Sequence, residues 1–444
     1  MKLLKELLNF VVGFFFTTII VLLAIVSFGL LVYPLEVYSS VLITVTLTFV
    51  SSYYSTVLRR KIFRLGRGRK PVYAIVLTSL IAVAMVSVFW IPSSTFESTH
   101  SSVKPYGIKP EYIKNHDGDK IAVYIHRPDK PNNLAPILFI NGGPGGSPSN
   151  KVKNYLDGYM KLGYVVYTFD PIGTGSSPMP KSNSSFTIAD EVENVNAIVK
   201  HYNISQVNLI AHSYGGNVAT RFIEKYTEKV HAYLAVDTAP IYSMQVNYPN
   251  EDQDSKFAKT VEPTRKNKKD IKVDPFQLLT DYSSLREMAR MFYGVGLMQK
   301  LEKNDIPYGD NSEYDYFVSL LVSLGSGYKP TDGKLENRLY STSNLLITKS
   351  LSESPDFTKE LRSKNTPPVL VIHPEFGVVP WQIHYKYKEF FNNTKFVTVS
   401  GADHGVWNSK LGSKILVEDG NLFFKGEPLS DEYTSKENPF PPIK

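Results

Sequence analysis

The sequence predicts an α/β fold, with a mostly parallel sheet and helices on both faces, preceded by three transmembrane helices. Long uncharged runs occupy much of residues 1–92, and strand-like apolar segments alternate with helical segments from residue 136 to residue 237. The same alternation resumes at residue 367, after a long polar insertion. Such alternation predicts a parallel sheet, because each crossover helix returns the chain to the same edge of the sheet.

Three runs near the N-terminus contain no Asp, Glu, Lys or Arg: Leu7–Tyr33, Val37–Leu58 and Pro71–Pro92. Each is long enough to cross about 30 Å of hydrocarbon as a helix. The first run is longer than the apolar part of a signal peptide, and two more such runs follow it. We therefore expect residues 1–92 to form a membrane anchor, with a Ser/Thr-rich tether at residues 93–105.

The basic residues predict how the anchor is oriented. Residues 59–70 hold seven Lys/Arg and no acidic residue, and residues 1–92 carry the whole net charge of +7. Positive loops stay in the cytoplasm, so we expect a multi-pass protein of the cell membrane with its larger domain on the extracellular side. The remaining residues have no net charge, so we expect contact with the lipid bilayer and no nucleic-acid partner. The chain has no cysteine, which excludes disulfides and thiolate metal sites.

The remainder of the chain divides into three parts. Residues 106–240 are predicted to form the first part of the α/β core, beginning with a hairpin that turns at His116–Gly118. Residues 241–365 interrupt the strand pattern and are predicted to be a mostly helical cap. Residues 366–444 complete the core and add a C-terminal tail, in which the segment ILVEDGNLFFKG predicts a hairpin.

The segment LIAHSYGGN contains the predicted nucleophile. Ser213 follows an apolar strand directly and precedes a helix, with Ala211 two residues before it and Gly215 two residues after it. A serine in a strained strand-to-helix turn needs small neighbours at these two positions. The pattern therefore predicts a nucleophile elbow.

A glycine-rich loop follows an earlier strand. Gly142–Gly146 holds four glycines and a proline, which indicates close approach of a ligand or another backbone. A phosphate-binding loop is excluded, because the required lysine and glycine spacing are missing. We expect Gly142 and Gly143 to provide one oxyanion donor and the N–H of Tyr214 to provide the other.

The general base is expected in the segment VSGADHGVW. His404 lies four residues past the last predicted strand, which is where a nucleophile elbow requires its histidine in chain order. No H-E-x-x-H or similar cluster is present, so we expect no metal ion and no cofactor.

Four segments together resemble a known family. The family is the proline iminopeptidase and tripeptidyl aminopeptidase branch of the α/β-hydrolases. Its HGGPG loop is similar to NGGPGG, and its D-x-R-G-x-G-x-S segment is similar to DPIGTGSS. Its G-x-S-x-G-G elbow is similar to AHSYGG, and its histidine loop is similar to GADHG. The resemblance covers residues 106–408 and implies an α/β-hydrolase fold with an inserted helical cap. The chain departs from the family pattern at Asn141, Ile172 and Ala211. In the family, glutamates of the cap hold the substrate's α-amine; the candidates are Glu251, Glu262, Glu287 and Glu313.

The acid of the catalytic triad is where the sequence departs most from the family. In related hydrolases the strand that matches VLVIH leads to an aspartate, and here Gly377 occupies that position. We favour Glu375, two residues earlier in the same loop, as the group that orients His404. Asp237, at the end of the preceding sheet strand, is the alternative.

These features predict a membrane-anchored serine hydrolase that faces outward. The family resemblance implies an aminopeptidase-like enzyme that cleaves short peptides at the amino end. An esterase or amidase acting on a small molecule at the same site is the alternative within this class. A non-catalytic α/β-hydrolase-like domain that binds or senses a ligand is the alternative from another class.

Overall fold

The computed structural model describes residues 2–31, 37–63, 72–89, 343–441, and 108–238 except 149, 179 and 181–184. The chain divides into two compact units, one built on the N-terminal helices and one on a β-sheet. The predicted tether at residues 93–105 and residues 241–342 of the predicted cap lie outside the described residues.

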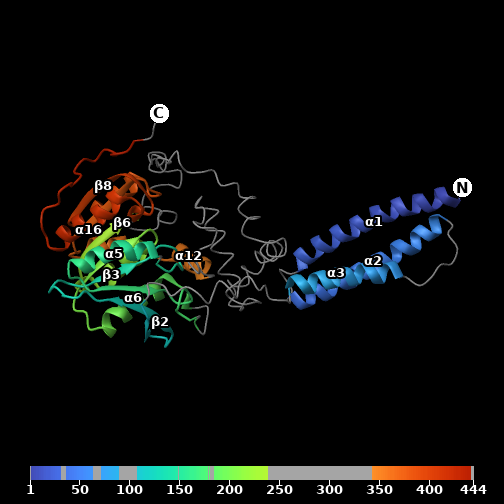
Figure 1. Ribbon diagram of the computed structural model, residues 1–444, viewed down its shortest axis with the longest axis horizontal. Coiled ribbons are helices and arrows are strands. Elements are labelled where there is room, and N and C mark those ends of the chain that lie inside the picture. Colours follow the sequence, from blue (N-terminus) through green and yellow to red (C-terminus); the bar gives the residue numbers. More distant parts are fainter. Residues whose placement is uncertain are drawn as a thin grey trace. The chain divides into compact units, whose positions relative to one another are not determined.

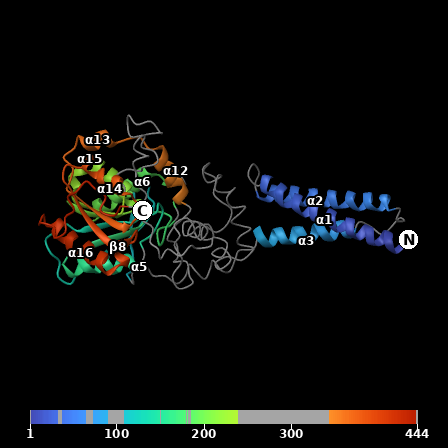
Figure 2. The ribbon, with the colours of Figure 1, turned by 90° about the horizontal axis from the view of Figure 1, so that it is seen from above.

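The N-terminal unit contains three helices that lie side by side, α1 (Lys2–Leu31), α2 (Val37–Ile62) and α3 (Val72–Phe89) (Figures 1 and 2). Two stretches are long and apolar enough to cross a membrane, Leu4–Phe28 and Ser39–Ile62. The apolar stretch found in α3, Ile75–Met85, is shorter than a membrane span. The structure therefore supports two candidate spans where the sequence predicted three.

The buried face of α2 is lined with hydroxyl side chains, whereas most of its large apolar side chains are exposed. Its buried hydroxyl residues recur every three or four positions, as one face of a helix requires, and are Ser40, Thr44, Thr48, Ser52 and Ser55; Val41 and Arg59 are buried as well. Leu42, on the opposite side, is 69% exposed, and Phe14 of α1 is 70% exposed. Small polar residues between helices and large apolar residues outside are typical of helices that pack in a lipid bilayer.

The described strands of the second unit form one eight-stranded sheet in the order β1-β2-β4-β3-β5-β6-β7-β8. β1 and β2 pair antiparallel, as the predicted hairpin requires, and β2 is antiparallel to β4. All other neighbours are parallel, so the predicted mostly parallel sheet is confirmed. The strands are β1 (Glu111–Lys114), β2 (Lys120–His126), β3 (Ile137–Ile140), β4 (Val166–Asp170), β5 (Val207–His212), β6 (Val230–Val236), β7 (Val369–Phe376) and β8 (Thr394–Asp403).

Helices cover both faces of the sheet (Figures 1 and 2). One face packs against α5 (Asn150–Lys161) and α16 (Lys410–Phe424). The other face packs against α6 (Ile188–His201), α7 (Gly215–Lys225), α12 (Ser343–Glu353), α13 (Thr358–Arg362), α14 (Trp381–Tyr385) and α15 (Tyr387–Phe390). Two short 3₁₀ helices, η3 (Thr227–Lys229) and η5 (Val406–Asn408), lead into β6 and α16.

The sheet separates two apolar cores. Ile137 and Phe139 of β3 belong to the core under α5 and α16, whereas Leu138 and Ile140 belong to the core under α6 and α7. Successive side chains of a strand point to opposite faces, so a strand buried on both sides must be apolar throughout. This explains why the central strands appear in the sequence as continuous apolar runs.

The prediction of a hairpin in the tail was wrong, because α16 is a helix. The Ser409 side chain accepts a hydrogen bond from Gly412 N (2.9 Å) and caps its first turn. Gly420, expected in a turn, lies within the helix against Tyr159, whose hydroxyl fills the space a side chain would need. The Tyr159 hydroxyl also donates to the carbonyl oxygen of Leu416. Packing against α5 thus stabilises a helix over the local turn signal.

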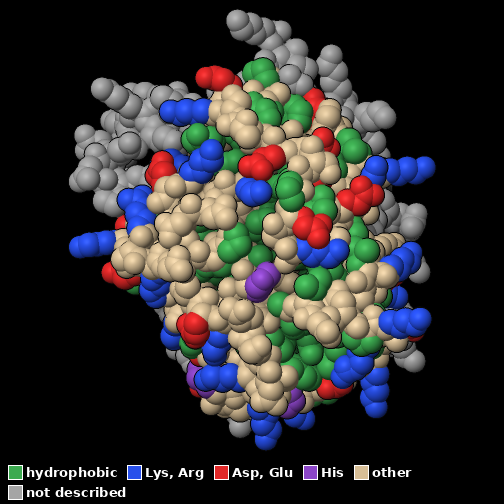
Figure 3. All heavy atoms as spheres, turned by 90° about the vertical axis from the view of Figure 1, so that its left-hand side faces the viewer, with side chains coloured by type: hydrophobic (Ala, Val, Ile, Leu, Met, Phe, Trp, Pro, Cys, Tyr) green, Lys and Arg blue, Asp and Glu red, His purple; other side chains and the backbone are tan. Residues whose placement is uncertain are grey.

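The surface carries charges of both signs. On the face drawn in Figure 3, Lys and Arg side chains are interspersed with Asp and Glu side chains, and apolar side chains lie between them. This distribution matches the sequence, in which the residues after position 92 carry no net charge.

Candidate active site

Ser213 occupies a sharp turn between β5 and α7. Its φ angle is +52°, a left-handed conformation that a residue with a side chain rarely adopts. The turn is held by Ser213 N, which donates to Val236 O of β6 (3.2 Å), and by Thr238, whose hydroxyl donates to Ser213 O. A strained residue held from two sides by the neighbouring strand is typical of a functional turn.

The glycines around this turn allow close backbone approach. A Cβ atom on Gly215 would lie 2.5 Å from Ile140 O, and a Cβ atom on Gly142 would lie 2.9 Å from Ser213 Cβ. Real Cβ atoms do not approach this closely, so both positions require glycine. The structure thus places the glycine-rich loop directly against Ser213.

A small cavity lies beside this loop, with room for about one water molecule (about 10 Å³). Gly142 and Tyr214, two of the three residues with predicted oxyanion donors, line it, whereas the third, Gly143, is not among its lining residues. Its other lining residues are Ile140, Asn141, Gly145, Phe169, Pro171, Glu191, Asn194 and Val218. The glycine-rich loop and the start of α7 therefore face the same small space.

His404 is paired with Asp237. The distance from His404 Nδ1 to Asp237 Oδ2 is 2.6 Å, and Asp237 is fully buried at the end of β6. A carboxylate can only accept a hydrogen bond, so the Nδ1–H of His404 donates and its Nε2 is left to accept a proton. His212 pairs with Val236 in the sheet, so Ser213 and Asp237 follow adjacent positions on neighbouring strands.

Asp237 is ionised despite its burial. Burial alone raises the pKa of this carboxyl group, but the hydrogen bond and the charge of His404 lower it, and the pKa is about 2. Val378 N (2.9 Å) and Val379 N (3.3 Å) also donate to its two oxygens. Its φ angle of +43° is left-handed, so the backbone turns sharply here as it does at Ser213.

The structure does not bring Glu375 to His404, which corrects the sequence prediction. Glu375 Oε2 accepts hydrogen bonds from Ser400 Oγ (2.8 Å) and Gly401 N (2.9 Å) instead. β7 continues to Phe376, with an irregularity in its pairing to β8 between Pro374 and Phe376, and Glu375 is hydrogen-bonded to β8. Asp237, the alternative weighed from the sequence, lies at His404 in its place.

His212 holds the histidine loop and was missed as a functional candidate. Its Nε2 lies 2.9 Å from the carbonyl oxygen of His404, so this nitrogen carries the proton and donates it. The rings of His212 and His404 are 4.4 Å apart, and Trp407 packs 4.6 Å from His212. Burial lowers the pKa of His212 to about 3, so this ring is neutral near pH 7.

Two more buried histidines lie behind Asp237. His384 Nε2 is 3.6 Å from Asp237 Oδ1, and its Nδ1 is 2.7 Å from His373 Nδ1. Burial lowers the pKa of His384 to about 3 and that of His373 to about 4, so both rings are neutral at pH 7. No motif in the sequence signalled this pair, because the two residues come from β7 and α14.

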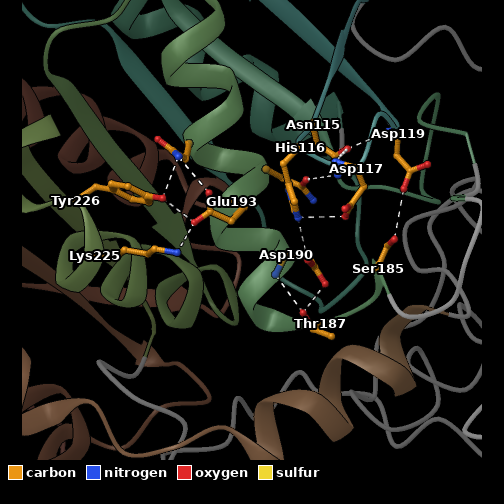
Figure 4. A network of polar contacts seen from close by, with 12 residues as sticks. Asn115, His116, Asp117, Asp119, Ser185, Thr187, Asp190, Glu193, Lys225 and Tyr226 are labelled. Atoms are coloured by element: carbon orange, nitrogen blue, oxygen red, sulfur yellow. Dashed lines mark hydrogen bonds and ion pairs between the residues drawn. The ribbon is translucent and has the colours of Figure 1, made fainter.

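A separate polar network lies at the turn between β1 and β2 (Figure 4). His116 Nε2 is 3.1 Å from Asp117 Oδ2 and 3.6 Å from Asp190 Oδ1. Among the described residues, these three are the set of side chains near enough together to hold a metal ion. His116 and Asp117 are nearly half exposed, and Asp190 is engaged with Thr187 at the start of α6. None of these three residues is among those predicted to carry the chemistry.

The glutamates considered as amine ligands, Glu251, Glu262, Glu287 and Glu313, lie outside the described residues. The described end of the predicted cap is helical, as expected, and consists of α12 and α13. Asn344 Nδ2 of α12 donates to Pro144 O of the glycine-rich loop (2.6 Å). The end of the cap is therefore joined to the loop that contains the predicted oxyanion donors.

Comparison with known proteins agrees with this geometry. Residues 135–407 match the family described as alpha/beta hydrolase fold, and the chain belongs to that family. The predicted α/β-hydrolase fold is thereby confirmed.

Individual relatives are distant. The chain is 24% identical to abhydrolase domain-containing protein abhd-5.2 of Caenorhabditis elegans over 325 residues, which cover 69% of this chain and 64% of that protein. It is 26% identical to a proline iminopeptidase of Clostridium botulinum over 113 residues, 25% of this chain and 38% of the enzyme. The chain thus spans less than two thirds of the length of these relatives. A solved esterase from Exiguobacterium antarcticum has 16% identity and a TM-score of 0.43, covering 71% of this chain and 97% of the esterase.

Proposed function

We propose that the protein is a serine hydrolase with Ser213 as nucleophile, His404 as general base and then acid, and Asp237 as the acid of the triad. The observation that carries the proposal is the 2.6 Å hydrogen bond between His404 Nδ1 and the buried Asp237, formed beside a strained serine turn. A buried carboxylate fixes the tautomer of the histidine and stabilises the imidazolium that forms during the reaction.

In the proposed reaction, Ser213 Oγ attacks the substrate's carbonyl carbon and His404 Nε2 takes the hydroxyl proton. The N–H groups of Tyr214 and of the loop at Gly142 and Gly143 stabilise the oxyanion. His404 then gives its proton to the leaving group, and the acyl-enzyme forms. Water activated by His404 hydrolyses this intermediate and restores Ser213.

A serine-directed fluorophosphonate tests the class of protein. We expect it to label the purified full-length chain, and we expect Ser213→Ala to remove the label. Labelling that persists in Ser213→Ala, or a folded wild-type protein that is never labelled, would contradict the proposal. The second result would favour a domain that binds or senses a ligand without catalysis.

Short peptides cleaved at the amino end are the proposed substrates. The support is the family resemblance of the four motifs and the partial similarity to a proline iminopeptidase. An ester or amide of a small molecule is the second candidate, because the same nucleophile, base and oxyanion donors act on either bond. A panel of aminoacyl and acyl chromogenic substrates distinguishes them: turnover of acyl esters alone would exclude the peptidase.

We also propose that the N-terminal helices anchor the protein in a membrane and that the hydrolase domain lies on the outer side. The apolar exposed faces of α1 and α2 support the anchor. Seven Lys/Arg at residues 59–70 support a cytoplasmic position for the segment after α2. If the hydrolase domain lies on the outer side, α3 must also cross the membrane. Determining the side of the membrane on which the domain lies therefore tests whether α3 spans it.

A further inference from the structure

Glu191 is a buried carboxylic acid that the proposed mechanism does not use. It lies on the first turn of α6 and lines the small cavity beside the glycine-rich loop, together with Gly142 and Tyr214. Its side chain is about 9% exposed. Burying an ionisable group costs free energy of folding unless the group is hydrogen-bonded. The hydrogen-bond partner of Glu191 therefore indicates its role.

The partner of Glu191 is the residue that follows the nucleophile. The Tyr214 hydroxyl donates a hydrogen bond to Glu191 Oε2, with a distance of 2.5 Å. The backbone of Tyr214 is in a helical conformation, with φ −52° and ψ −33°, and Asn217 N donates to its carbonyl oxygen (2.8 Å). The Tyr214 N–H group shares a peptide plane with the Ser213 carbonyl group, whose oxygen accepts hydrogen bonds from Gly216 N (3.1 Å) and from the Thr238 hydroxyl. The bond to Glu191 holds the side chain of the same residue, so Tyr214 is held on both sides of its Cα atom.

We propose that Glu191 is a positioning residue, which holds the Tyr214 side chain so that the Tyr214 N–H stays directed at the oxyanion. This inference rests on the proposed hydrolase function, in which that N–H is a donor. A donor stabilises the oxyanion only when it is already oriented before the charge develops. The Glu191–Tyr214 bond supports that orientation from α6, an element that takes no other part in the proposed chemistry, and adds to the bonds that hold the Ser213 carbonyl group.

The bond does not depend on one protonation state. The pKa of Glu191 is raised to about 7, because burial and the charge of Asp190 raise it more than the bond from Tyr214 lowers it. The carboxylate accepts from the Tyr214 hydroxyl, and the carbonyl oxygen of the neutral acid accepts as well. Glutamine also keeps an acceptor at this position, which makes Glu191→Gln the conservative variant.

The chain contains a matched control on the same two helices. Glu193 of α6 accepts from the Tyr226 hydroxyl (2.6 Å) and pairs with Lys225 (2.6 Å), at the end of α7 opposite to Tyr214 (Figure 4). Glu193→Ala therefore removes a carboxylate–tyrosine bond between α6 and α7 without touching the nucleophile elbow.

The test compares Glu191→Ala, Glu191→Gln, Tyr214→Phe and Glu193→Ala in the full-length protein. We expect Glu191→Ala and Tyr214→Phe each to lower kcat by about tenfold or more with KM changed less than about twofold, because the lost interaction acts on the transition state. The double variant should lose no more than either single variant. Glu191→Gln should restore most of kcat, and Glu193→Ala should affect only thermal stability. An equal loss of kcat in Glu191→Ala and Glu193→Ala would overturn the proposal, because general helix packing would then explain both.

A second readout does not need activity. In protein with isotope-labelled tyrosine, the amide resonance of Tyr214 is assigned by its disappearance in Tyr214→Phe under the same conditions. We expect this resonance to shift in Glu191→Ala and to return to its wild-type position in Glu191→Gln. An unchanged resonance in Glu191→Ala would overturn the positioning role. If the wild-type protein neither reacts with the fluorophosphonate nor turns over any substrate, the proposed function fails, and the amide resonance still decides whether Glu191 orients Tyr214.

Discussion

Gly377 leaves open the space that the Asp237 carboxylate fills. A Cβ atom on Gly377 would lie 2.7 Å from Asp237 Oδ1 and 2.8 Å from Oδ2. Gly377 occupies the position where the family resemblance expects the acid after β7, whereas the acid that contacts His404 follows β6. The two features belong together, because a side chain at Gly377 and the carboxylate of Asp237 compete for one volume.

Gly377→Ala is expected to lower kcat by about 10–100-fold without unfolding the protein. The added methyl group pushes the Asp237 carboxylate away from His404, and displacements of this size cost about that much in rate. Steady-state kinetics together with a thermal melt measure the effect. Glu375→Ala, in the same loop but hydrogen-bonded to β8, is the control and should keep its rate. A fully active Gly377→Ala variant would contradict the competition for space.

Moving the acid to the other strand extends this test. Asp237→Gly should be nearly inactive, and the double variant Asp237→Gly/Gly377→Asp should recover part of kcat, because either strand end faces the same volume. No recovery in a folded double variant would show that only the β6 position can orient His404.

Asp237→Asn is expected to lower kcat by ~10⁴-fold, while Glu375→Gln changes it less than about twofold. An asparagine no longer fixes the Nδ1–H tautomer of His404 and cannot stabilise the imidazolium. The Glu375 carboxylate accepts hydrogen bonds from Ser400 Oγ and Gly401 N. Kinetics of both variants on one substrate decide the matter. A large loss confined to Glu375→Gln would restore the sequence-based choice.

Acidification should destabilise the fold through four buried histidines, against the opposing contribution of Glu191, whose pKa burial raises to about 7. Burial lowers the pKa values of His126 and His373 to about 4 and those of His212 and His384 to about 3. An unfolded chain takes up these protons below about pH 6.5, so the stability contributed by the neutral rings is complete above that pH and is lost as the pH falls toward their folded values. The melting temperature should therefore fall between about pH 7 and about pH 5.

His126→Gln provides a check on this origin. His126 lies on β2, where its Nε2 is 3.1 Å from Thr168 Oγ1, away from the triad. The variant should have a lower melting temperature than the wild type near neutral pH. Its melting temperature should decrease less on acidification, because the variant lacks one group that binds a proton on unfolding. An equally steep loss would assign the acid sensitivity to other groups.

The absence of cysteine allows a direct test of orientation. Single cysteines replace Gly66 in the basic segment and the exposed Asp129 in the second unit. We expect a membrane-impermeant maleimide to label Asp129→Cys in intact cells and Gly66→Cys only after permeabilisation. Labelling of both residues only after permeabilisation would place the domain in the cytoplasm and would show that α3 does not cross.

The sequence by itself determined the features that depend on nearby residues. The sharp turn at Ser213 and the close approach of the glycine-rich loop could be predicted from the sequence, because such turns and approaches restrict residue types within a few positions. The apolar runs predicted the central strands for the same reason, since a strand buried on both faces has no polar position.

Only the tertiary structure decided which distant side chains meet. Glu375 and Asp237 were both compatible with the sequence, and the choice depended on how far β7 extends and on which strand faces His404. The helix α16 overrode a turn signal because Tyr159 packs against Gly420. The Glu191–Tyr214 bond joins residues 23 positions apart on separate helices. Contacts of this kind depend on the packing of whole elements, and no local pattern of residue types encodes them.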